Sequence, residues 1–182
     1  MTRSLPIAAL LLFTVACNSN KTEPAPEATT VAPVAETPAP EKHDYGIKAT
    51  YSTDFGLGDP KLGDVVIALW KQYDDNTLEK GRGYFADSVT MWTDGWKYHG
   101  TSDSLMKIVM KMRNTYSANK TVIAAIAPLK ANDLNENWVC IWGTEYTTLK
   151  GKKDSADIQE NWRFDKNGKI DMMHSYRRKI AK

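Results

Sequence analysis

Three side chains in this sequence are suited to moving a proton, and each lies among aromatic residues. They are Asp94 in "MWTDGWKYHG", Glu160 in "IQENWRF" and His174 in "DMMHSYRR". Carboxyl and imidazole groups act as general acids and bases when their surroundings bring their pKa values near the working pH. These three residues are therefore the candidate catalytic groups of the chain.

Asp94 has two interpretations. It precedes Gly95, and an Asp-Gly pair is typical of a tight turn, because aspartate accepts hydrogen bonds from nearby backbone and glycine permits positive φ. In that interpretation Asp94 only closes the turn. The alternative is a carboxylate that works at the rim of a pocket.

Glu160 also has two interpretations. It alternates with Ile158 and Trp162, so the three side chains share one face of a predicted strand. If that face lines a pocket, its rings desolvate the carboxyl group, raise its pKa and leave it partly protonated, able to donate a hydrogen bond. The alternative is an exposed strand glutamate paired with a neighbour such as Arg177.

His174 shares its strand face with Met172 and Tyr176, which favours a satisfied core or interface histidine over a catalytic one. An aromatic-lined pocket would suit a flat, apolar ligand. The candidate ligand-binding residues are those that could form its wall: Trp70, Trp92, Trp162, Met173 and Arg177.

Several function classes find no support in the residues. The histidines His43, His99 and His174 have no ligand spacing, so no metal site is predicted. No phosphate-binding loop, nucleophile elbow or dinucleotide motif is present, and no cofactor is predicted. The net charge is only +2, which gives no basic field for nucleic acid.

The positioning elements follow from periodicity. Asp59 as N-cap and Pro60 at the first position predict a helix over 59–76. A short helix at 77–85, a strand near 88–92 and a capped helix over 101–114 follow. After Lys120 the pattern becomes that of strands separated by turn clusters; these strands are 121–129, 137–149, 156–165 and 169–178.

The strand "WVCIW" is apolar on both faces. Trp138, Cys140 and Trp142 point one way and Val139 and Ile141 the other. A sheet covered by helices on one side only should carry polar residues on the other. Something therefore covers the second face, and a partner chain, as in a homodimer, is the simplest candidate.

The first 42 residues are predicted to be processing signal and tether. The apolar run over 5–16, which ends at Ala16-Cys17, resembles the signal of bacterial lipoproteins, whose cysteine becomes the first mature residue and takes up acyl chains such as palmitate. Residues 1–16 are then the signal peptide, and 17–42 hold the lipidated cysteine and a proline-rich disordered tether. Residues 43–182 form the domain, lipid-anchored in the bacterial cell envelope and facing the periplasm or exterior. A plain secretory signal is the alternative.

The order of elements resembles the nuclear-transport-factor-2-like superfamily, and within it the SnoaL-like and ketosteroid-isomerase-like branch. The residues that carry the resemblance are "YDDNTLEKGRGYFADSV", the "DG" and "HG" pairs beside a turn, and "WRFDKNGKI"; it covers 60–182. It implies an α+β fold, in which a cone of N-terminal helices packs on a curved, mainly antiparallel sheet with a pocket inside. Many members are homodimers.

The same resemblance gives three catalytic positions in the isomerases. The acid that donates to the developing oxyanion matches Glu160, the base position falls on Thr93 with Asp94 one residue later, and the tyrosine position falls on Leu69. Steroid isomerase chemistry is therefore not predicted as it stands. The expected function is a membrane-tethered domain that binds a small apolar molecule. The alternatives are an acid–base enzyme of isomerase or cyclase type and a non-catalytic dimeric interaction module.

Overall fold

The computed structural model describes residues 43–180. The predicted signal peptide, Cys17 and the tether of 17–42 lie outside the described residues. No helix within 43–180 is long and apolar enough to span a membrane.

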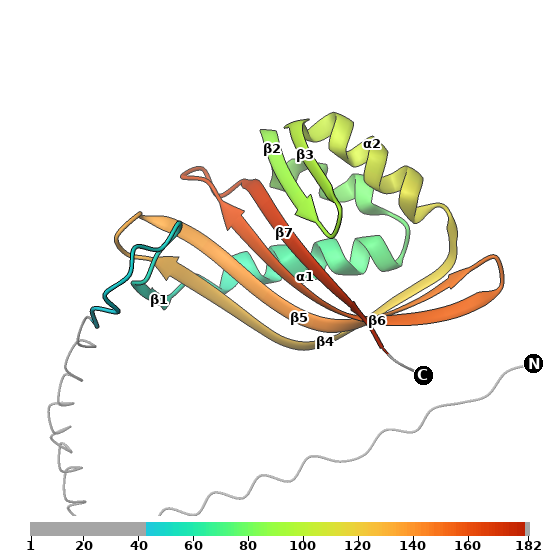
Figure 1. The fold of residues 1–182 in the computed structure, drawn as a ribbon. Coiled ribbons are helices and arrows are strands. Elements are labelled where there is room, and N and C mark those ends of the chain that lie inside the picture. The colour runs from blue at the N-terminus through green and yellow to red at the C-terminus, as the bar shows by residue number, and fades with distance from the viewer. Residues whose placement is uncertain (1–42, 181–182) are drawn as a thin grey trace, which may run out of the picture. The chain divides into compact units, whose positions relative to one another are not determined.

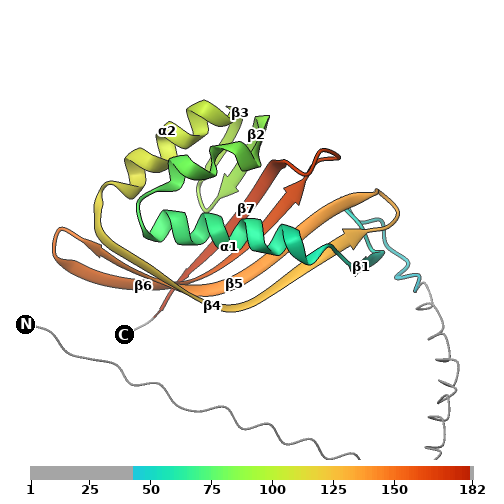
Figure 2. The ribbon, with the colours of Figure 1, turned by 180° about the vertical axis from the view of Figure 1, so that it is seen from behind.

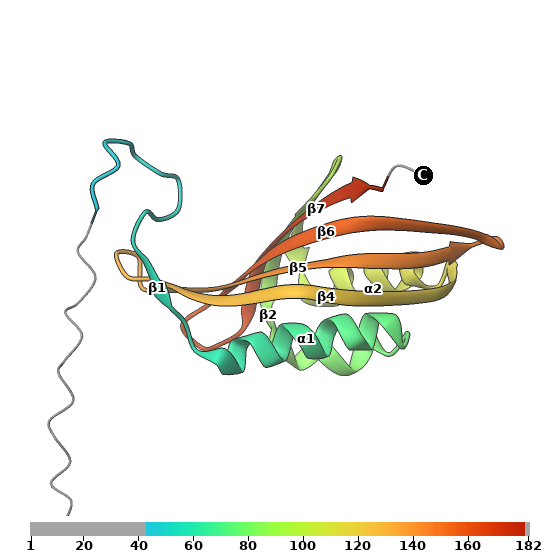
Figure 3. The same cartoon turned by 90° about the horizontal axis from the view of Figure 1, so that it is seen from below.

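Two α-helices lie on the same side of the long strands (Figure 3). Helix α1 (Pro60–Asp74) begins where the Asp59 carboxylate accepts the backbone N–H of Lys61 at 2.9 Å, as the sequence predicts. Helix α2 (Ser102–Arg113) is capped in the same way by Thr101. The predicted short second helix is a 3-10 helix, η1 (Leu78–Tyr84).

The strands form one seven-stranded sheet in the order β1-β4-β5-β6-β7-β2-β3 (Figure 1). Neighbouring strands pair antiparallel except β2 and β7, which pair parallel. Their bounds are β1 Phe55–Leu57, β2 Phe85–Thr93, β3 Trp96–Thr101, β4 Tyr116–Ala131, β5 Glu136–Leu149, β6 Lys152–Phe164 and β7 Ile170–Lys179. The sheet curves around the helices (Figure 2), which confirms the predicted α+β fold class.

Strands β1 and β3 were not predicted. β1 is only three residues long and adds to the edge of β4. β3 is six residues long, and in it Trp96 and Tyr98 alternate with Lys97 and His99. That alternation is the ordinary signal of a half-buried strand, so the sequence pattern was sufficient to predict β3.

The core lies between the helices and the concave face of the sheet. Helix α1 contributes Val66, Leu69 and Trp70, and β5 contributes Val139 and Ile141. These residues expose 7% or less of their surface. Burial of apolar area at this scale is what holds the helices against the sheet.

The convex face of the sheet is covered at one end by the chain itself. The Tyr51 ring, in the segment that precedes β1, packs edge-on against Trp138 with 5.1 Å between centroids. Trp138 is only 5% exposed, whereas Trp142, on the same face and four residues further along β5, is 36% exposed. Part of the cover predicted for this face is therefore the domain's own N-terminal segment.

Candidate functional site

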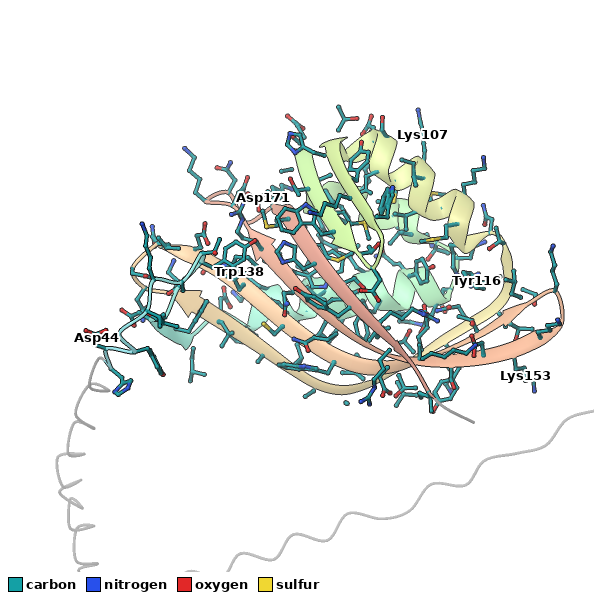
Figure 4. All side chains as sticks on the ribbon, viewed as in Figure 1. Asp44, Lys107, Tyr116, Trp138, Lys153 and Asp171 are labelled. Carbon is teal, nitrogen blue, oxygen red and sulfur yellow. The ribbon has the colours of Figure 1, made fainter. Side chains whose placement is uncertain are left out.

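A cavity of about 300 Å³ lies between α1, α2 and the concave face of the sheet. Most of its wall is apolar, with Leu69 from α1, Leu105 and Met106 from α2, and Met173 from β7. Tyr116 lines one end, near the C-terminal end of α1 (Figure 4). A mainly apolar cavity with a few polar groups is the usual form of a small-molecule site.

Glu160 is the polar centre of this cavity. The indole Nε1–H of Trp70 donates to Glu160 Oε2 at 2.6 Å, and the indole of Trp162 donates to the same oxygen at 3.1 Å. Ser175 also hydrogen-bonds the carboxyl group. Residues from α1, β6 and β7 thus fix one carboxyl group inside the cavity.

Burial raises the pKa of Glu160 to about 7, although the hydrogen bonds from Trp70, Ser175 and Trp162 act in the opposite direction and favour the charged form. The neighbouring Glu145 carboxylate raises it further. Because Oε2 already accepts two N–H groups, a proton on that oxygen would face two donors. The proton that titrates near neutral pH therefore sits on Oε1.

A second polar group in the cavity is an ion pair. The Arg177 guanidinium on β7 donates through Nη1 to Glu145 Oε2 on β5. Tyr73 lies beside this pair, and its pKa is raised, mainly by burial and then by the Glu145 charge. The pair joins β5 and β7 across β6 from within the cavity wall.

Asp94 lies at the tight turn between β2 and β3, where Gly95 has a φ of +78°. Its Oδ2 accepts the backbone N–H of Arg177 at 3.0 Å, so the carboxylate also holds the end of β7. Asp94 lines the cavity as well. Asp94 therefore both closes the turn and contributes a carboxylate to the cavity wall.

The structure brings most of the sequence-derived candidates together. Four of the five proposed wall residues line the cavity, together with Glu160 and Asp94; they are Trp70, Trp162, Met173 and Arg177. Leu69 and Thr93, the two family positions that carry no acid or base, line it too. Trp92 does not.

His174 and Trp92 lie on the convex face. Their rings stack at 4.6 Å between centroids with 7° between planes, and the Tyr51 hydroxyl lies 3.4 Å from His174 Nε2. In β7, Met173 and Ser175 line the cavity, so His174 between them points to the opposite face. Burial lowers its pKa, and the Arg163 charge acts in the same direction. The structure does not bring His174 to Glu160, and the two cannot act on one ligand.

Sequence reasoning missed Glu145 and Ser175 as cavity residues. The alternation of side chains along a strand would have identified both, because residues two positions apart point to the same face. Glu145 shares the parity of Val139 and Ile141, the core side of β5, and Ser175 shares that of Met173. Within 43–180, no group of three or more His, Cys, Asp or Glu side chains is arranged to hold a metal ion.

No protein-family model matches the sequence, and no curated protein matches it. Solved structures do resemble the described domain. One is an epoxide hydrolase from M. tuberculosis that is described as LEH-like, with 12% identity, a TM-score of 0.54, and coverage of 64% of this chain and 82% of that chain. Another is AusH from Aspergillus nidulans, with 8% identity, a TM-score of 0.55, and coverage of 70% and 90%.

An NTF2-like protein of unknown function from an Exiguobacterium species is also similar, with 18% identity and a TM-score of 0.50. The match covers 65% of this chain and 99% of that one. At these identities the likeness concerns the fold alone. The domain therefore has the cone-shaped α+β fold of NTF2-like proteins.

Proposed function

We propose that this domain binds a small, mostly apolar molecule in the cavity and that Glu160 makes the main polar contact with it. The observation that carries the proposal is one carboxyl group, fixed by two indole N–H groups, in a wall that is otherwise mainly apolar. A buried polar group is costly unless it is partnered. An apolar ligand with one polar atom would complete the partners of this one.

The hydrogen-bonding capacity of Glu160 leaves room for a ligand. A carboxylate offers about four acceptor positions. Trp70, Trp162 and Ser175 use three of them. The remaining position belongs to Oε1, because both indoles donate to Oε2.

The experiment compares the wild-type protein with Glu160→Gln and Glu160→Ala in a screen of hydrophobic ligands by ligand-observed NMR. We expect Glu160→Ala to weaken capture by about 1–3 kcal/mol, the cost of an unpaired buried polar group, and Glu160→Gln to keep the fold. The matched control is Glu136→Ala on the convex face. Equal capture by all of these proteins would contradict the proposal.

A second function, acid–base catalysis, is favoured by one observation. The pKa of Glu160 is about 7, where a general acid or base is most effective at neutral pH. Asp94 lines the same cavity and supplies a second carboxyl group. The test is exchange of the α-protons of a cyclic ketone in D₂O, followed by NMR. Catalysis that survives in Glu160→Ala would rule out this role.

We also propose that Cys17 is lipidated and anchors the protein in the bacterial cell envelope. The support is the apolar run that ends at Ala16-Cys17 and the proline-rich segment after it. One acyl chain gives only marginal anchoring, and stable attachment takes more. Cys17→Ser should release the protein from the membrane fraction or block its processing. Unchanged mass and fractionation would count against lipidation.

Homodimerisation through the convex face is the remaining proposal. Several large aromatic side chains on that face stay exposed, among them Trp142, Tyr146 and Tyr176. A stable interface buries about 1,200–2,000 Å² in total, and this open end of the sheet would be its centre. Light scattering should give twice the monomer mass at micromolar concentration, and a monomer mass would contradict the proposal.

A further inference from the structure

We propose that the ligand is a cation: a compact hydrophobic amine whose ammonium group pairs with Glu160. This inference rests on the proposed binding function and narrows it to one ligand class. It follows from the charges that line the cavity and from the hydrogen bonds that Glu160 already makes.

The charge of the cavity wall is unbalanced. Its charged side chains are Asp94, Glu145, Glu160 and Arg177. The single guanidinium is paired with Glu145, so these two charges offset each other. Asp94 and Glu160 remain as acids without a cation in the wall. An interior of this kind attracts cations and repels anions.

Glu160 in particular has only uncharged partners among the described residues: Trp70, Trp162 and Ser175. Elsewhere the domain does supply a cation to a similar group. Glu136 accepts from the Trp138 indole at 3.1 Å and also pairs with Arg163 at 3.3 Å. The missing partner at Glu160 is the one that a ligand ammonium would provide.

The titratable and charged groups that the neighbouring elements contribute to the cavity also favour a positively charged ligand. Tyr73 comes from α1, Glu145 from β5, Asp94 from the end of β2 and Arg177 from β7, while α2 contributes only uncharged side chains to the wall. The Glu145 charge disfavours a further negative charge at Glu160. A ligand carboxylate would meet Asp94 and Glu160 in a wall whose one guanidinium, Arg177, is already paired with Glu145, which disfavours acids as ligands.

The hydrogen-bond geometry separates an amine from a ketone. Burial raises the pKa of Glu160, but the three protein donors that point at its carboxyl group act in the opposite direction and favour the charged, accepting form. The open acceptor position on Oε1 can therefore accept a hydrogen bond from another donor. An ammonium N–H meets that need, whereas a carbonyl oxygen would require Glu160 to stay protonated.

The aromatic wall also suits a cation. Trp70, Tyr73, Phe85 and Trp162 line the cavity, and the rings of Phe85 and Trp162 lie 6.4 Å apart, centroid to centroid. An ammonium group near aromatic faces gains from the ring quadrupole, most when it is desolvated. Carboxyl group and rings together form a site for a hydrophobic amine.

The test uses three probes with one hydrocarbon skeleton: adamantylamine, adamantanone and adamantane carboxylic acid. Calorimetry at pH 7, in two buffers that differ in ionisation enthalpy, gives both the affinity and the protons exchanged. We expect the amine to bind the protein at least about tenfold more tightly than the other two. Because the pKa of Glu160 is about 7, binding should release roughly half a proton.

Two variants and one pH series complete the experiment. Glu160→Gln should lose both the preference for the amine and the proton release, and Glu136→Gln should keep both. In the wild-type protein, amine affinity should rise by about tenfold per pH unit below 7 and level off above it, a result that needs no variant to fold. Tightest binding by the ketone, with proton uptake, would overturn the amine inference and leave the binding function standing. Binding of none of the three probes would contradict the binding function itself.

Discussion

The tripeptide Glu-Asn-Trp occurs twice in this chain, at 136–138 in β5 and at 160–162 in β6. In both copies the tryptophan indole donates to the glutamate two residues before it, at 3.1 Å. The local chemistry is the same, yet one copy lies on the convex face and the other inside the cavity. Trp138 is found near the N-terminal segment in Figure 4.

Strand register makes the difference. Val139 pairs with Trp162 and Ile141 with Glu160, so the second copy shares the core side of the sheet. Trp138 pairs with Arg163, which gives the first copy a cation. A glutamate with an arginine beside it links two strands, whereas a glutamate with only neutral donors in a mainly apolar cavity has the arrangement that the proposed binding function requires.

The largest expected effect comes from removing the tryptophan of each copy. Trp162, 7% exposed, belongs to the core cluster, so Trp162→Ala should lower the free energy of unfolding by about 3–5 kcal/mol and abolish ligand binding. Trp138→Ala should cost no more than the lower end of that range, because Tyr51 lies on a peripheral segment that can close over the gap. Chemical denaturation measures both. A larger loss of unfolding free energy in Trp138→Ala than in Trp162→Ala would contradict the difference proposed between the two copies.

The second effect concerns pH. Glu160 has a folded pKa of about 7 against an ordinary value of 4.5, so between these values the folded state holds a proton that the unfolded state has released. Stability from this group is therefore full below about pH 4.5 and is lost as pH rises to 7, by about 3 kcal/mol in total. His174, whose pKa is lowered by burial, acts in the opposite direction.

The comparison that isolates Glu160 is the unfolding free energy of the wild-type protein minus that of Glu160→Gln, measured from pH 4.5 to 8. The difference should fall with pH, since His174 contributes equally to both proteins. A difference that stays constant or rises would show that the Glu160 carboxyl group is solvated.

The third effect removes the cation of the first copy. Arg163 donates to Asp171 at 2.9 Å and to Glu136 at 3.3 Å, and all three side chains are partly buried. Arg163→Met should therefore lower the free energy of unfolding by about 1–3 kcal/mol, because it leaves partly buried carboxylates without their donor. Ligand binding in the cavity should not change. Thermal unfolding and calorimetry provide the two readings, and altered ligand affinity would show that the two copies are coupled.

The smallest expected effect concerns the influence of the Glu145 charge on the pKa of Glu160. Glu145→Gln removes a negative charge that raises the pKa of Glu160 and frees Arg177 from its partner. Both changes favour the charged form of Glu160, so its pKa should fall below 7. The change is followed by NMR titration. A pKa that stays at about 7 or rises in this variant would mean that the Glu145 charge does not act on Glu160.

Much of the fold was accessible from sequence because its signals are local. Asp59 and Pro60 mark the start of α1, and two-residue alternation gives the long strands. The same alternation puts Glu160 and Trp162 on one face. These inferences need only the geometry of a single element.

The remaining features depend on elements that lie far apart in the sequence. The bond from Trp70 to Glu160 spans 90 residues and exists only once α1 lies across β6. The placement of His174 required knowing which face of β7 is the inner one. Predicting that Trp138 is covered required knowing where Tyr51 lies, and no periodicity in the sequence predicts that position. Such contacts follow from tertiary packing.

The central claim is that Glu160 is a buried carboxyl group without a cation, held ready for a ligand. The most direct measurement is a ¹³C NMR titration of its side-chain carboxyl carbon in the ligand-free protein, with the resonance assigned by its loss in Glu160→Gln. We expect a midpoint near pH 7, because burial of the carboxyl group outweighs its hydrogen bonds from Trp70, Trp162 and Ser175. A midpoint near the ordinary value of 4.5 would contradict the account, because Glu160 would then be solvated and the cavity would lack its polar centre.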